Sequence, residues 1–199
     1  EPHSRERNKR GKDMTGTLIV LAVIAVAAFA LVGIYNGLVK LRNMAEQAWS
    51  DVDVQLKRRY DLIPNLVETV KGYASHEKST FESVVEARNR AMQATTPEAK
   101  AEAENFLQST LKSLFALSEA YPDLKANQNF LELQAELSKI EEQIQLARRY
   151  YNAVVRDLNT KIETVPSNFV ANMFGFQKRE YFELDSEAER TAPQVSFGQ

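Results

Sequence analysis

An uncharged run of 26 residues, from position 14 to position 39, is the feature that most limits what this chain can fold into. Its apolar centre, LIVLAVIAVAAFALVGI, covers residues 18–34. As a helix the run is about 39 Å long, which is enough to cross a hydrocarbon layer of about 30 Å. Lys40 and Arg42 follow directly and end the run. The pattern predicts a single transmembrane helix over residues 15–39, with the lipid bilayer as its partner.

A cleaved signal peptide is the alternative to a transmembrane helix for this run. No small-residue cleavage motif precedes a polar mature start, and the helical pattern continues beyond the run. Tyr35 lies where an interfacial aromatic residue is expected. The single-pass anchor is therefore the favoured interpretation.

The charges that flank the span bear on its orientation. The N-terminal tail, residues 1–14, contains five basic residues: Arg5, Arg7, Lys9, Arg10 and Lys12. Because basic flanks stay in the cytoplasm, this count favours an extracytoplasmic position for the rest of the chain. Translation from Met14 would remove those residues and reverse the bias. We expect the extracytoplasmic side, and the cytoplasmic side is the alternative.

The composition indicates an all-α protein. The chain of 199 residues has only 7 glycines and 6 prolines, and straight-chain helix-forming residues dominate it. Without cysteine it can form no disulfide. The net charge of −2 argues against a general nucleic-acid-binding protein.

Apolar residues at helical spacing continue past the span and predict four helices in residues 40–165. Pro64 interrupts the pattern, and Asp61 precedes it at the distance of an N-cap from the first turn of a helix. We therefore expect the first helix to end near Tyr60 and the chain to reverse at Asp61; a kinked but continuous rod is the alternative. The next helices should end near Ala94, before Tyr121 and near Thr164.

Two patterns support an antiparallel up-down four-helix bundle. Thr96 and Pro97 have the residue types of an N-cap and a first helical position. Residues 127–164 carry an apolar stripe with coiled-coil spacing: Leu133, Leu137, Ile140, Ile144, Ala147, Tyr151, Val154 and Leu158. A reversal at Asp61 would allow the helices to cover one another's stripes, which a long isolated rod could not do.

Lys57, Arg58 and Arg59 form a basic cluster before the expected reversal. One interpretation is that the three cations stabilise the C-terminal end of the first helix. The other is that, together with Asp61, they form a docking patch for a partner protein at the membrane-distal tip. The two interpretations differ in what substitution of these residues would change: helix stability or partner binding.

The character of the sequence changes after Pro166. Residues 166–184 contain five aromatic residues within a short distance, among them Phe174 and Phe176, which are candidate partner-binding residues. This segment could seal the base of the bundle, lie in the membrane interface or offer aromatic anchors to a partner. Residues 185–199 are polar and are expected to form a disordered tail.

No residue pattern indicates catalysis. His76 is followed by Glu77 but lacks the second histidine of a zinc-protease helix, and no phosphate-binding glycine loop or nucleophile elbow is present. The many carboxylates fall on polar helix faces. We therefore predict no catalytic, cofactor-binding or metal-binding residues and expect that the chain is not an enzyme.

Two blocks of the sequence resemble the LemA family of bacterial membrane proteins. They are residues 35–77, YNGLVKLRNMAEQAWSDVDVQLKRRYDLIPNLVETVKGYASHE, and residues 147–183, ARRYYNAVVRDLNTKIETVPSNFVANMFGFQKREYFE. The resemblance implies a membrane-anchored antiparallel four-helix bundle in the bacterial cytoplasmic (inner) membrane. It supplies no catalytic or cofactor residue, and a relative among magnetosome-membrane proteins suggests a role in organising membranes or complexes.

These observations favour a membrane-anchored scaffold or adaptor that recruits partner proteins without catalysis. The sequence also allows a homo-oligomer, since Gly33 and Gly37 form a GxxxG motif that can bring two membrane helices together. The alternative is a membrane-tethered sensor that binds a small ligand inside the bundle. A roomy or polar pocket in the bundle would favour the sensor.

Overall fold

The structure, a computed structural model, describes residues 2–183, and the side chains of residue 14 and of residues 16–183. Its contacts divide the chain into two compact units. Among the described residues, the first unit combines residues 2–44 with Arg156–Arg179, and the second combines Ala45–Val155 with residues 180–183. The disordered tail expected at residues 185–199 lies outside the described residues.

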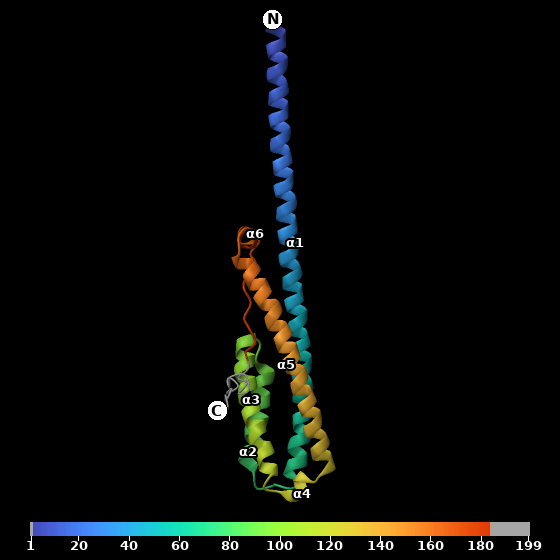
Figure 1. Ribbon diagram of the computed structural model, residues 1–199. Coiled ribbons are helices and arrows are strands. Elements are labelled where there is room, and N and C mark those ends of the chain that lie inside the picture. Colours follow the sequence, from blue (N-terminus) through green and yellow to red (C-terminus); the bar gives the residue numbers. More distant parts are fainter. Residues whose placement is uncertain (1, 184–199) are drawn as a thin grey trace, which may run out of the picture. The chain divides into compact units, whose positions relative to one another are not determined.

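The described part of the chain is helical and contains no β-strand. The all-α fold class is therefore confirmed. Figure 1 traces the helices in chain order: α1 (Pro2–Lys71), α2 (Lys78–Gln93), α3 (Pro97–Ser118), α4 (Pro122–Lys125), α5 (Gln128–Glu163) and α6 (Ser167–Met173). The long helix α1 includes the apolar run and most of the N-terminal tail.

The reversal expected at Asp61 is wrong, because α1 continues through Pro64 to Lys71. A proline inside a helix has no N–H for the carbonyl group four residues earlier, here that of Tyr60. The guanidinium group of Arg88 on α2 replaces this donor, with 2.8 Å between Nε and the Tyr60 carbonyl oxygen. A donor from another helix thus satisfies the carbonyl group, and the chain does not turn here.

The chain reverses instead at residues 72–77, between α1 and α2. The amide groups of Tyr73 and Ala74 both donate to the carbonyl oxygen of Val70, at 3.0 Å, which closes the end of α1. Gly72 follows the last helical residue and a basic residue, Lys71, lies in the last turn. This combination is a recognised signal for a helix C-terminus. The expected single helix from residue 61 to residue 94 is therefore two separate helices.

Four helical segments share the core of the second unit: the part of α1 from Ala45 on, α2, α3 and the part of α5 up to Val155. The stripe expected on α1 is buried, since Ala45, Ala48, Val52 and Leu56 have no exposed surface. On α5 the expected positions Leu137, Ile140, Ile144, Tyr151 and Val154 are buried as well. Helices α2 and α3 lie side by side (Figure 1).

Contacts in the second unit define the relative directions of its helices. Between α1 and α3, the residue numbers of the contacting pairs increase along both helices, from Asp53 with Lys100 to Arg59 with Glu104. Along α1 and α5 they run in opposite order, from Trp49 near Tyr151 to Tyr73 bonded to Asn127. The first pair of segments is therefore parallel and the second antiparallel.

Two helix starts in the second unit follow the sequence prediction. Thr96 caps α3, its side chain accepting a hydrogen bond from the backbone N–H of Ala99 at 3.2 Å, and Pro97 occupies the first helical position. The side chain of Asn127 caps α5 by accepting from the backbone N–H of Phe130 at 2.9 Å. Both are the usual partners of an N-cap residue.

The first unit contains the apolar run of α1, the end of α5, and α6. By length and composition α1 holds one segment able to cross a membrane, and none of that apolar window is buried in the protein. The bend into α6 is held by Ser167, whose hydroxyl donates to the carbonyl oxygens of Lys161 (2.6 Å) and Thr164 (2.9 Å). Val170 and Ala171 form the buried face of α6.

Candidate functional site

Three charged side chains meet inside the second unit. Arg59 on α1, only 2% exposed, pairs with Glu104 on α3, which is 1% exposed. Its second contact is with Glu141 on α5, at 2.8 Å between Nη1 and Oε2. Charged groups are seldom buried without a partner, because the loss of hydration must be compensated. This ionic cluster therefore links three helices through one guanidinium group.

Tyr60 adds a neutral donor to the ionic cluster, since its hydroxyl donates to Oε1 of Glu104. Burial raises the pKa of Tyr60 to about 12; the positive charge of Arg59 opposes this shift and the negative charge of Asp53 adds to it. The phenol is therefore protonated near neutral pH. It acts as a hydrogen-bond donor rather than as a base or nucleophile.

A second cross-helix ion pair lies beside the ionic cluster. Nζ of Lys100 on α3 is 2.6 Å from Oδ1 of Asp53 on α1. The Lys100 side chain is mostly buried, whereas that of Asp53 is more than half exposed. Asp53 and Tyr60 lie about two turns apart on α1, so these contacts set the axial position of α3 against α1.

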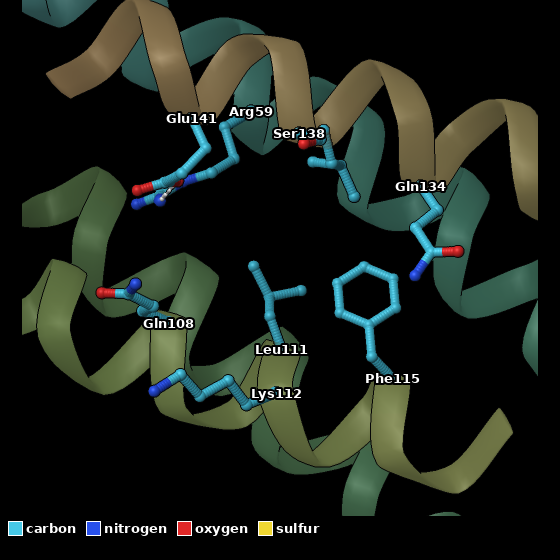
Figure 2. Close-up of a pocket in the computed structure, with 9 residues that line it drawn as sticks. Arg59, Gln108, Leu111, Lys112, Phe115, Gln134, Ser138 and Glu141 are labelled. Atoms are coloured by element: carbon cyan, nitrogen blue, oxygen red, sulfur yellow. Dashed lines mark hydrogen bonds and ion pairs between the residues drawn. The ribbon is translucent and has the colours of Figure 1, made fainter. Parts of the chain in front are cut away.

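A cavity of about 300 Å³ opens beside the ionic cluster. Figure 2 shows Arg59 and Glu141 at one end, Phe115 and Leu111 along one wall, and Gln134 at the other end. Gln108, Lys112, Leu137 and Ser138 complete the lining. An apolar wall with a few polar groups at the ends is typical of sites that bind small molecules.

The predicted basic docking patch is divided by the structure. Lys57 and Arg58 are exposed, but Arg59 is buried in the ionic cluster, and Asp61 is an exposed residue inside α1 rather than a cap. Consecutive residues of a helix point in different directions, so the three basic residues cannot share one face. The expected role at a helix C-terminus is also wrong, because α1 ends at Lys71.

Phe174 and Phe176 lie in the first unit, where both contact Tyr35 of α1. The ring centroids are 4.8 Å apart for Tyr35 and Phe174, and 5.8 Å for Tyr35 and Phe176. Phe174 is 57% exposed, whereas Phe176 is half-buried beneath the guanidinium group of Arg42. These two predicted residues therefore belong to one aromatic cluster with the end of the apolar run.

Gly37 of the expected helix-pairing motif is covered within the first unit. A Cβ atom at this position would lie 2.5 Å from Nζ of Lys161, so the glycine allows the lysine side chain to pass. Gly33, by contrast, faces open space. Only one of the two glycines is thus free to face a second membrane helix.

The segment after α6 is held by asparagine side chains of α5 that the sequence analysis did not single out. In the second unit, Asn152 exchanges two hydrogen bonds with the backbone of Phe182, at 3.0 and 2.9 Å. In the first unit, Asn159 does the same with Arg179, at 2.9 Å for both bonds. Each side-chain amide donates to the backbone C=O and accepts from the backbone N–H of one residue, as the backbone of a neighbouring β-strand would. An asparagine on the apolar stripe of a long helix is the signal that could have revealed them.

Phe182 completes the core of the second unit. It has no exposed surface, and its ring centroid is 5.5 Å from that of Trp49. One aromatic residue of segment 166–184 thus seals a core as one interpretation proposed. Phe169 and Phe174, at 64% and 57% exposed, do not.

Among the residues that the structure describes, no three His, Cys, Asp or Glu side chains come together as metal ligands would. His76, the one histidine considered for chemistry, is exposed in the turn between α1 and α2. Charged residues from three helices converge in the ionic cluster, next to its cavity.

The profile of the LemA family matches residues 48–197, about three quarters of the chain. The chain belongs to the LemA family. The matched range includes the ionic cluster and the segment that carries Phe182. The resemblance seen in the two sequence blocks is therefore confirmed.

Two groups of relatives resemble this LemA-family chain. "Protein LemA" of Metamycoplasma hominis is 28% identical over 177 residues, which cover 87% of this chain and 79% of the relative. "Magnetosome protein MamQ 2" of Paramagnetospirillum magneticum is 25% identical over 201 residues, and "Magnetosome protein MamQ" of Magnetospirillum gryphiswaldense is 23% identical over 202 residues. Both alignments cover 87% of this chain and 74% of the relative. With the apolar helix, these relatives indicate a membrane-associated protein.

Proposed function

We propose that this chain is a scaffold or adaptor, anchored in a bacterial membrane by one helix, whose helical bundle recruits partner proteins without catalysing a reaction. The observation that carries the proposal is the continuity of α1. One helix supplies both the apolar run and one of the four helical segments that form the core of the second unit. A partner bound to the second unit would therefore be attached to the membrane through the helix that carries the apolar run.

The bundle in this proposal is an antiparallel one. The contacts of Arg59 with α3 and α5, together with the opposite order of contacts along α1 and α5, support alternating helix directions. A buried ion pair contributes little net stability but penalises arrangements that leave it unpaired. We infer that the ionic cluster selects this arrangement over other packings of similar amphipathic helices.

Lys57, Arg58 and Asp61 supply the docking surface of the proposed scaffold. All three are exposed on α1, within two turns of one another. Charged side chains on a surface steer association and set specificity, even where they add little affinity. The exposed part of the basic cluster therefore keeps its proposed role in partner binding, without Arg59.

Cross-linking in native membranes tests this docking surface. The full chain would carry a photo-reactive amino acid at Val54, which is 47% exposed on the same face of α1, with Lys57 and Arg58 either unchanged or as Lys57→Glu/Arg58→Glu. Cross-linked partner should fall several-fold in the double variant. A matched control, Lys139→Glu/Arg149→Glu, reverses two exposed charges on α5 and should leave the yield unchanged. Equal yields in all three proteins, or cross-links only to lipid, would contradict the scaffold.

A membrane-tethered sensor is the second candidate function, and the cavity beside Arg59 supports it. Its volume of about 300 Å³ lies at the small end of the range for ligand sites, and its lining residues come from three helices. A ligand held there would favour one spacing of α3 and α5. Such a ligand would be a small molecule with an apolar body and a polar end.

Thermal unfolding of the full chain in detergent separates the sensor from the scaffold. A ligand at 100 times its Kd should add about 2.7 kcal/mol to the free energy of unfolding. The same compound should have no effect on Ser138→Phe, which fills the cavity from α5. A panel of small amphipathic metabolites with no such difference between the two proteins would count against the sensor.

A further inference from the structure

Four large apolar side chains of the first unit are exposed within ten positions of the sequence. Val165 and Met173 are each 73% exposed, Phe169 is 64% exposed and Phe174 is 57% exposed. Phe169 and Met173 lie four residues apart on α6 and so share one face. Exposed apolar residues normally occur singly, and a group of them marks an interaction surface. We call Phe169, Met173 and Phe174 the α6 patch.

Packing on the opposite face of α6, and contacts at both ends of the helix, keep the side chains of the α6 patch exposed. The opposite face of α6 is buried through Val170 and Ala171, and Ser167 ties the start of the helix to the end of α5. After the helix, Asn159 holds the backbone of Arg179, and Lys178 pairs with Glu163 at 2.7 Å. The exposed side chains therefore cannot turn inward without losing these contacts.

The aromatic cluster fixes the level of the α6 patch along α1. Phe174 contacts Tyr35, with 4.8 Å between ring centroids, and Tyr35 directly follows the apolar centre of the run. A hydrocarbon layer of about 30 Å accommodates about 20 helical residues. If residue 14 lies at one edge of the layer, Tyr35 lies at the other. The α6 patch then lies at the boundary between acyl chains and headgroups.

The charge around the α6 patch suits a membrane surface. Residues 35–44 and 156–179 together contain six basic and two acidic residues, whereas the whole chain has a net charge of −2. Basic residues next to a membrane attract anionic lipid headgroups. The first unit thus combines exposed aromatic residues with a local positive charge, as interfacial membrane anchors do.

We propose that α6 is a second membrane anchor, whose Phe169, Met173 and Phe174 insert at the headgroup boundary of the leaflet from which α1 emerges. The occupant of the patch is lipid rather than a second protein, because its contact with Tyr35 places it beside the membrane segment. The proposal requires α1 to cross a membrane but does not depend on the scaffold role. Its failure would leave the cross-linking result from position 54 unaffected.

Depth-dependent quenching tests this second anchor. Since the chain has no cysteine, Phe169→Cys can carry a single environment-sensitive fluorophore. The full chain would be placed, one copy to each nanodisc, in anionic lipid with quenchers at shallow or deep acyl positions. We expect blue-shifted emission and several-fold stronger quenching from the shallow position. Leu146→Cys, at 57% exposed on α5 of the second unit, is the matched control and should remain unquenched.

A second variant checks that the reporter measures insertion. Labelled Phe174→Cys should lose its quenching several-fold when Phe169→Asp/Met173→Asp is added, while the thermal midpoint in detergent stays unchanged. A label at position 169 that behaves like the one at position 146 would overturn the proposal. So would a blue shift that appears only in discs with two copies, because a second chain would then cover the patch.

Discussion

Two stretches of helix α1 contain similar apolar residues but meet opposite surroundings. Between Leu18 and Val32 the large apolar side chains are 50% to 79% exposed, whereas Ala45, Ala48, Val52 and Leu56 are fully buried. In the first stretch apolar residues cover every face of the helix; in the second they form a stripe among polar residues. The first composition suits a lipid environment, and the second suits packing against other helices.

Hydrophobicity alone does not position the second stretch. Around the apolar stripe, α1 also buries Arg59, which requires Glu104 and Glu141 at defined places on two other helices. A stripe of alanine, valine and leucine could slide along its partners, but a buried guanidinium group could not. Substitutions in the packed stretch should therefore lower the unfolding free energy, whereas substitutions in the apolar stretch should weaken membrane insertion.

The largest effect is expected for Arg59→Met, which removes the cation and leaves Glu104 buried without its charge partner. Loss of one member of a buried pair costs about 3–5 kcal/mol of unfolding free energy. Arg58→Met, at the neighbouring exposed position, should change it by less than about 0.5 kcal/mol. Urea unfolding of both variants in detergent gives the comparison. Equal losses would show that burial of Arg59 does not matter to the packed stretch.

A charge in the apolar stretch should act on membrane insertion instead. Val26→Arg is expected to weaken insertion by about 3 kcal/mol, since arginine is disfavoured by about that amount at the centre of a membrane helix. The unfolding free energy in detergent should not change. The control is Val54→Arg, at an exposed position of the packed stretch. Carbonate extraction of membranes measures insertion, and full retention of Val26→Arg would contradict the transmembrane assignment.

Replacing a leucine by alanine should have different effects on stability in the two stretches. Leu56→Ala should lower the unfolding free energy by about 2 to 3 kcal/mol, because it removes buried methyl groups and leaves a cavity. Leu21→Ala, at 56% exposed, should have no measurable effect on denaturant unfolding in detergent. If both variants lost the same amount, the apolar stretch would also be packed against protein.

Much of the fold could be predicted from local patterns. The 26-residue uncharged run, the stripes on α1 and α5, and the cap of α3 at Thr96 each depend on residues close together in sequence. In the structure the run is helical, most residues of the stripes are buried and Thr96 caps α3. Helix periodicity and capping are short-range effects, so they can be read without knowing the tertiary structure.

The errors arose where a distant residue decides the outcome. The sequence groups Arg59 with Lys57 and Arg58, because its partners on α3 and α5 are distant along the chain. Pro64 would break an isolated helix and so predicts a reversal at Asp61, whereas in the structure Arg88 of α2 satisfies the affected carbonyl group. Gly72 was the local signal for the true reversal, and the nearby proline outweighed it.

The smallest change in unfolding free energy is expected for the hydrogen bond from Arg88 to the Tyr60 carbonyl group, which Pro64 leaves without a backbone donor. It directly tests why α1 continues past Pro64. Arg88→Leu should cost about 1 to 2 kcal/mol, because the carbonyl group of Tyr60 loses its donor. In Pro64→Ala the amide N–H of residue 64 can reach that carbonyl group within the helix, so Arg88→Leu should then cost about 1 kcal/mol less. Urea unfolding of the four proteins measures this coupling. An equal cost in both backgrounds would mean that Arg88 does not compensate for the proline, and the continuity of α1 would need another explanation.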